Sequence, residues 1–109
     1  ISLRQTGRGS RHVVAAWTAP PGTDPADLEY RVSVADMKFG TSDAFIVPGD
    51  EHQLEMHNLG DAQLVPNGTY NGTVEYRHVA DKSEPNGGWQ RMSPPEELTT
   101  APAPPEGYR

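Results

Sequence analysis

The chain has 109 residues, enough for one domain with a single hydrophobic core, and it contains 11 glycines, 11 prolines and no cysteine. The lack of cysteine excludes a disulfide framework, a cysteine-ligated zinc site and a thiol nucleophile. The formal net charge of −6, from 15 acidic and 9 basic side chains, argues against nucleic acid or an anionic membrane as the main partner.

The first half of the chain contains two segments with the alternation of β-strands. Apolar residues share one parity in residues 10–17, which end in Trp17, and the proline-rich stretch 18–22 then stops the segment. Residues 28–34, LEYRVSV, show the clearest period-two pattern of the chain. We therefore expect a strand there with one buried and one solvated face.

The second half continues in the same way. Weaker patterns predict strands over residues 39–47 and 53–58, and clear alternation returns over residues 70–78. Asn71 falls on the polar parity of that last segment, so we expect it to face solvent. After a polar connection with an Asn-Gly turn signal, the segment WQRMS, residues 89–93, is predicted to be the last strand.

Short strands separated by turn signals, with no window of helical periodicity, predict an all-β, immunoglobulin-like antiparallel β-sandwich of about seven strands. The order and spacing of Trp17 before Ala-Pro-Pro, Tyr30 in its strand, Leu64-Val-Pro and Tyr70 resemble a fibronectin type III domain over nearly the whole chain. The resemblance implies that Trp17, Tyr30 and Leu64 lie in the core. It also implies that Tyr70 buries its ring at the corner between the sheets and bonds backbone a few residues upstream.

Two features depart from the family pattern. Gly72 stands where the family usually has a bulky residue, and we expect a large neighbour such as Trp17 or Trp89 to fill the space. Residues 58–63 form a longer link into the corner than the family usually has. We place the domain at residues 1–100 and, because residues 101–109 are rich in proline, a linker to a following domain after it.

The tripeptide Asn-Gly-Thr occurs twice, at Asn67 and Asn71. At Asn67 the turn chemistry of Asn-Gly at a tight corner is a sufficient explanation. Both copies nevertheless satisfy the N-glycosylation pattern at positions expected to face water. The sequence leaves turn chemistry and glycosylation open as alternatives.

No pattern of catalysis or of cofactor or metal binding emerges from the sequence. His52 and His57 are five residues apart and would point to opposite faces of a strand, so a shared metal is not expected. The acidic residues of loops 24–29 and 50–55 lack the alternating ligands and glycine pivot of a calcium loop. The serines lack a glycine-framed nucleophile turn. We therefore expect a domain that is not an enzyme and holds no cofactor.

The polar loop before Trp89 is the candidate surface for a protein partner. Lys82, Glu84, Asn86 and Trp89 combine an exposed loop with an aromatic side chain, which is a composition found at binding hot spots. The competing interpretation makes Trp89 a half-buried residue of an edge strand.

The resemblance implies a non-catalytic extracellular module of a multidomain receptor or adhesion protein, secreted or part of a cell-surface membrane protein. Such a module acts as a spacer and protein-binding surface beside adjacent domains of its own chain. Receptor-type tyrosine phosphatases and receptor kinases are among the parent proteins that the resemblance suggests. The chain has no run of about 18 apolar residues and no signal-peptide core, so we expect no membrane contact by this segment. A spacer module of a secreted bacterial polysaccharide-degrading enzyme and an intracellular scaffold domain are the alternatives. Glycan occupancy of the sequons distinguishes the receptor or adhesion module from these two alternatives.

Overall fold

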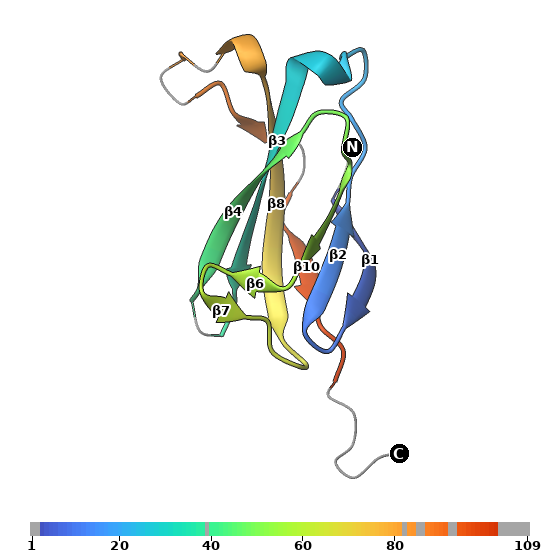
Figure 1. Cartoon of the computed structure of the whole chain (residues 1–109), viewed down its shortest axis with the longest axis vertical. Helices are drawn as coiled ribbons and strands as arrows, with labels where there is room; N and C mark the ends of the chain where they lie inside the picture. The colour runs from blue at the N-terminus through green and yellow to red at the C-terminus, as the bar shows by residue number, and fades with distance from the viewer. Residues whose placement is uncertain (1–2, 39, 82, 85–86, 92–93, 103–109) are drawn as a thin grey trace.

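Two antiparallel sheets pack face to face in the computed structural model of the chain (Figure 1), which describes residues 3–38, 40–81, 83–84, 87–91 and 94–102. The predicted all-β sandwich class is confirmed, and the described residues contain no α-helix. Two single-turn 3₁₀ helices, η1 (Pro25–Asp27) and η2 (Val79–Asp81), lie in the connections.

The smaller sheet has three strands in the order β1-β2-β5. These strands are β1 (Arg4–Gly9), β2 (His12–Ala16) and β5 (Gln53–Met56). Along β2 the apolar residues of one parity are buried, as the sequence predicts for a strand with one face against a core.

The larger sheet has the order β10-β8-β3-β4, and the short strand β9 also pairs with β8. Its strands are β3 (Leu28–Asp36), β4 (Ser42–Pro48), β8 (Thr69–His78), β9 (Gln90–Arg91) and β10 (Glu96–Thr99). A separate small hairpin, β6 (Asn58–Leu59) with β7 (Ala62–Gln63), accounts for the long link that the sequence shows before the corner. Its turn contains Gly60 at a φ of 61°, which suits glycine.

The core lies between the sheets and is built from the inward parity of the long strands. Trp17 and Tyr30 are both buried, and their rings meet edge to face with centroids 5.5 Å apart. Leu64 and Tyr70 are buried in the same core at the corner before β8. The alternating burial of β3 follows the period-two pattern of LEYRVSV residue by residue.

The carboxyl-terminal end of the sandwich differs from the sequence prediction. In the segment predicted as the last strand, β9 covers only Gln90 and Arg91, and residues 92–93 lie outside the described part of the chain. The last strand is instead β10, which begins after the two prolines and buries Leu98 completely. Proline lacks a backbone N–H for the ladder, so pairing resumes only beyond Pro95. In the strand predicted over residues 39–47, β4 begins at Ser42, and Phe39 is outside the described residues.

The space beside Gly72 is filled by different neighbours from those expected. A Cβ at this position would lie 2.9 Å from Leu98 Cδ1 and 3.2 Å from Leu3 Cδ2, so these two leucines occupy the space and not Trp17 or Trp89. The prediction was wrong because Leu98, which fills this space, lies on β10, and that strand was not predicted.

The corner before β8 is tied to the residues that follow β10. Thr100 is buried, its hydroxyl donates to Val65 O at 2.6 Å, and it accepts from Gly68 N at 2.7 Å. Ala101 donates its N–H to Gly9 O and accepts from Asn67 N. Backbone bonding to the sandwich therefore continues one residue into the segment predicted as linker, while residues 103–109 lie outside the described part.

Candidate functional site

The outward face of β3 and β8 carries a set of matched charges. Glu29 and Arg31 alternate on β3, and Glu75 and Arg77 alternate on β8, on the parity that points away from the core. The antiparallel register places Glu29 opposite Arg77 and Arg31 opposite Glu75. Each cross-strand pair therefore brings opposite charges together, which stabilises sheet pairing.

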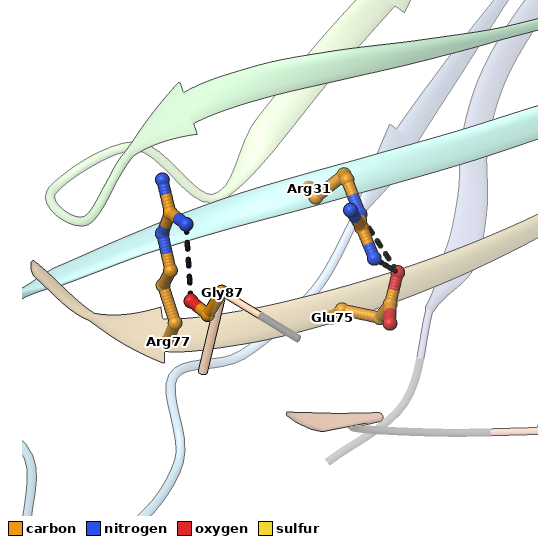
Figure 2. Close-up of polar contacts among 4 residues, drawn as sticks. All are labelled: Arg31, Glu75, Arg77 and Gly87. Atoms are coloured by element: carbon orange, nitrogen blue, oxygen red, sulfur yellow. Dashed lines mark hydrogen bonds and ion pairs between the residues drawn. The ribbon is translucent and has the colours of Figure 1, made fainter. Parts of the chain in front are cut away.

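Both pairs are closed ion pairs in the structure. Arg31 donates from Nε to Glu75 Oε1 at 3.0 Å and from Nη2 at 2.9 Å. Arg77 contacts Glu29 Oε1 at 2.6 Å through both Nε and Nη2, and donates from Nη1 to Gly87 O at 3.0 Å. Figure 2 shows the Arg31–Glu75 pair and the bond from Arg77 to the loop carbonyl. The Arg77–Glu29 pair is the less exposed of the two, at 15% and 16% of the side chains.

Trp89 lies against both arginines. Arg77 Cζ lies 4.2 Å and Arg31 Cζ 4.7 Å from the centroid of its ring, within the range of cation–π attraction. With the Gly87 carbonyl bonded to Arg77, these contacts anchor residues 87–89 on the face of the larger sheet. We call Glu29, Arg31, Glu75, Arg77 and Trp89 the arginine–tryptophan cluster. The cluster holds a surface segment in place, because both guanidinium groups form ion pairs with carboxylates and pack against the indole ring.

The residues predicted for partner contact are placed only in part. Lys82 and Asn86 lie outside the described residues. Glu84 is exposed, and its carbonyl accepts from Gly87 N at 2.8 Å. Trp89 is half-buried over the two arginines, just before the short edge strand β9. Their contact with a partner stays a prediction.

The arginine–tryptophan cluster was missed from the sequence, although a signal for it existed. The pattern Glu-x-Arg occurs on the outward parity of two predicted strands, at residues 29–31 and 75–77. Only the strand order of the folded sheet shows that these two segments pair and that Trp89 reaches both.

The two sequons lie at the opposite end of the larger sheet. Asn67 is exposed in the corner with a φ of 54°, the left-handed conformation for which Asn is suited. It borders a hollow that also contains the exposed Met37. Asn71 is half-buried on the outward face of β8, beside a shallow hollow of about 370 Å³ lined by small residues such as Ser33 and Ala35.

A second polar contact, on the smaller sheet, was also not predicted. The rings of His12 and His57 stack with centroids 5.4 Å apart, and His57 Nε2 lies 2.7 Å from Glu55 Oε2. The hydrogen bond from His57 lowers the pKa of the Glu55 carboxyl, and the nearby His57 and His12 charges act in the same direction. Within the described part of the chain, no group of three or more His, Asp or Glu is arranged to hold a metal ion.

The fold is that of a fibronectin type III domain, as comparison with solved structures shows. Those solved structures include the solution structures of the fn3 domain of human collagen alpha-1(XX) chain, which share 20% sequence identity at a TM-score of 0.66 and are matched over 98% of this chain and 84% of that one. The FN1-FN3 domains of chicken CNTN1 match at 15% identity and a TM-score of 0.63, over 91% of this chain and 30% of that one.

A redesigned β-sandwich protein is similar as well, at 18% identity and a TM-score of 0.65, with 100% of this chain and 95% of that one covered. No protein-family profile matches the sequence. No curated protein matches it either. The described residues include no helix of the length and hydrophobicity needed to cross a membrane.

Proposed function

We propose that the chain is a non-catalytic extracellular module of a multidomain receptor or adhesion protein, where it acts as a spacer and as a protein-binding surface. Its fibronectin type III fold supports this role, because the similar domains of collagen XX and CNTN1 are extracellular modules without enzyme activity. Fold alone does not define function, so the surface of this chain has to carry the rest of the proposal.

The spacer role is supported by where the chain enters and leaves the sandwich, which is at opposite ends of β1. Leu3 precedes β1 at the end where Arg4 pairs with Ala16. Ala101 follows β10 and bonds Gly9 at the other end of the same strand. In Figure 1, β1 lies along the long axis of the view. A sandwich connected in this way would lengthen a tandem chain by about the length of β1, which has six residues and spans roughly 20 Å.

The sequons support the extracellular setting. We propose that Asn67 and Asn71 carry N-linked glycans. Asn67 projects from an exposed corner, and the small side chains around Asn71 leave room over the sheet for a first sugar. Glycans at both positions would cover the corner end of the larger sheet and direct partners to the end that carries the arginine–tryptophan cluster.

Intact mass, measured before and after enzymatic removal of N-glycans from the protein of its native source, tests the proposal. A mass loss that disappears in Asn67→Gln/Asn71→Gln supports secretory origin and an extracellular module. No loss from native material overturns the proposed glycosylation and the receptor or adhesion setting, and favours the secreted bacterial spacer or the intracellular scaffold.

The contribution of the loop before Trp89 is tested separately. Once a partner is captured by the native extracellular region, Glu84→Ala and Trp89→Ala should each weaken binding. Unchanged affinity in both variants rules out this loop as the contact surface. Thr6→Ala, an exposed residue of β1 on the other sheet, is the matched control.

A further inference from the structure

A groove opens at the end of the sandwich where β3 begins and β4 ends. Figure 1 shows that this end lies opposite the corner before β8, where the sequons are. The groove has a volume of about 720 Å³ and lies between η1, the start of β3, the end of β4 and η2. The arginine–tryptophan cluster borders it through Glu29, which lines the groove and binds Arg77.

The groove presents apolar side chains to solvent. Ile46 and Val79 line it and are 57% and 39% exposed. They are two of the three large hydrophobic residues that are exposed in the described part of the chain, the third being Met37 at the opposite end. Pro25 and Pro48 extend the apolar wall. Exposed apolar surface gathered into a concave site is typical of ligand or partner contact.

The charges around this apolar surface are acidic. Asp24 and Asp50 line the groove and are exposed, and none of the described residues that line it is basic. Glu29 also lines it, but its charge is matched by Arg77. Asp27 and Glu51, also exposed, adjoin the rim. The described part of the groove therefore combines an aliphatic floor with an excess of negative charge, which complements a cationic and aliphatic ligand.

The shape of the groove is set by close backbone packing. Gly49, in the turn after β4, is buried, and a Cβ there would overlap the carbonyl oxygens of Pro25 and Leu28. This contact joins the turn to η1, and Asp24 caps η1 by accepting from Ala26 N at 3.1 Å. Both walls are thus held without a bound ligand, which lowers the ordering cost of binding.

We propose that this groove docks a basic segment of a partner protein, which inserts one aliphatic side chain between Ile46 and Val79 and places lysine or arginine beside Asp24 and Asp50. The inference rests on the proposed role as a protein-binding module and names a contact surface for it. Glycans at Asn71 would leave the groove open, because Asn71 and Arg77 are six residues apart along β8, or roughly 20 Å.

The test uses the isotopically labelled 109-residue chain and a short lysine-rich peptide with a single central leucine, followed by NMR titration. We expect shift changes centred on the backbone amides of Ile46, Gly49, Asp50 and Val79, and weaker binding as salt is raised, since exposed charges are screened. Two control peptides have serine in place of the leucine, or glutamate in place of the lysines. Each should bind less than the parent peptide.

Matched variants locate the contact. Ile46→Lys should lower the affinity for the peptide about tenfold, through loss of apolar contact and through charge repulsion. Asp50→Lys should weaken it about threefold or more, as for an exposed ion pair that changes sign. Met37→Lys and Asp61→Lys make the same two changes at exposed positions away from the groove and should leave binding unchanged. Circular dichroism and thermal unfolding verify that all four variants are folded.

Several results would overturn the proposal: no shift changes, changes centred elsewhere, or equal binding of the glutamate peptide. Concentration-dependent shifts of the same amides without peptide would instead assign the groove to a second copy of the chain, and would also overturn it. A glycosylated native protein that fails the peptide test refutes only the groove. A chain that passes it but lacks glycans in native material refutes only the glycosylated receptor or adhesion setting.

Discussion

The Tyr70 hydroxyl accepts a hydrogen bond from the backbone N–H of Val65 at 3.0 Å, across the corner through which the chain passes from the smaller to the larger sheet. Tyr70 is buried, so Tyr70→Phe leaves the Val65 N–H without this partner. We expect a loss of about 1 kcal/mol in the free energy of unfolding, measured by urea denaturation.

Tyr30→Phe is the matched control for that measurement. The Tyr30 hydroxyl is buried without a hydrogen-bond partner among the described residues, and burial raises the pKa of its phenol. Removing an unsatisfied buried hydroxyl relieves a desolvation cost, so Tyr30→Phe should be neutral or stabilising. Equal losses in the two variants would show that the corner bond contributes nothing of its own.

The two outward arginines should differ in their contribution to stability. Arg77→Gln removes the less exposed ion pair, the bond to Gly87 O and a cation–π contact, and leaves the Glu29 charge behind. We expect a loss of about 2 kcal/mol. Arg31→Gln breaks the more exposed pair with Glu75 and should cost about 1 kcal/mol or less. Chemical denaturation of both variants in parallel measures the difference, and the reverse ranking would contradict the role of Arg77 as the main anchor.

Thr100 should behave as part of the domain core. Thr100→Val leaves the Gly68 N–H and the Val65 carbonyl without their partner, and we expect a loss of about 2 kcal/mol in thermal or urea unfolding. Thr99→Val is the control. Among the described residues its hydroxyl bonds only the exposed Arg8 guanidinium, so the effect should be below about 0.5 kcal/mol. A small effect at Thr100 would mean that the residues after β10 are not needed to hold the corner.

Gly72→Ala should be destabilising because its Cβ would meet Leu98 Cδ1 at 2.9 Å. Overpacking of this kind costs about 1–3 kcal/mol. A smaller residue at position 98 makes room, so Gly72→Ala/Leu98→Val should lose less stability than the sum of its two single variants. Additive losses in that double-mutant cycle would show that Leu98 does not set the requirement for glycine.

The Glu55 carboxyl is the group for which a pH dependence is expected. The hydrogen bond from His57 lowers the pKa of this carboxyl from the ordinary 4.5. The contribution of the contact to the free energy of unfolding is therefore present above pH 4.5, and it is lost as the pH falls through the lower pKa of the folded state. NMR titration of the Glu55 side chain should give a pKa below 4.5 in the native chain. In His57→Gln it should move up towards 4.5, while His78→Gln, a histidine on the other sheet, should leave it unchanged.

The sequence by itself determined the sandwich class and the buried face of the strands over residues 28–34 and 70–78. Alternation over residues 28–34 and 70–78 is local, since successive side chains of a strand point to opposite sides, and it needs no knowledge of the partner strand. The spacing of Trp17, Leu64 and Tyr70 likewise indicates the fibronectin type III fold.

Only the tertiary structure decided which outward side chains meet. Arg31 and Glu75 are 44 residues apart in the sequence, and the groove at Ile46 and Val79 is assembled from four separate elements. It also placed Leu98 in the core after two prolines, where four residues are too few for alternation to show. Strand order and register set these contacts, and both arise from the packing of the whole chain, so periodicity within one segment does not contain them.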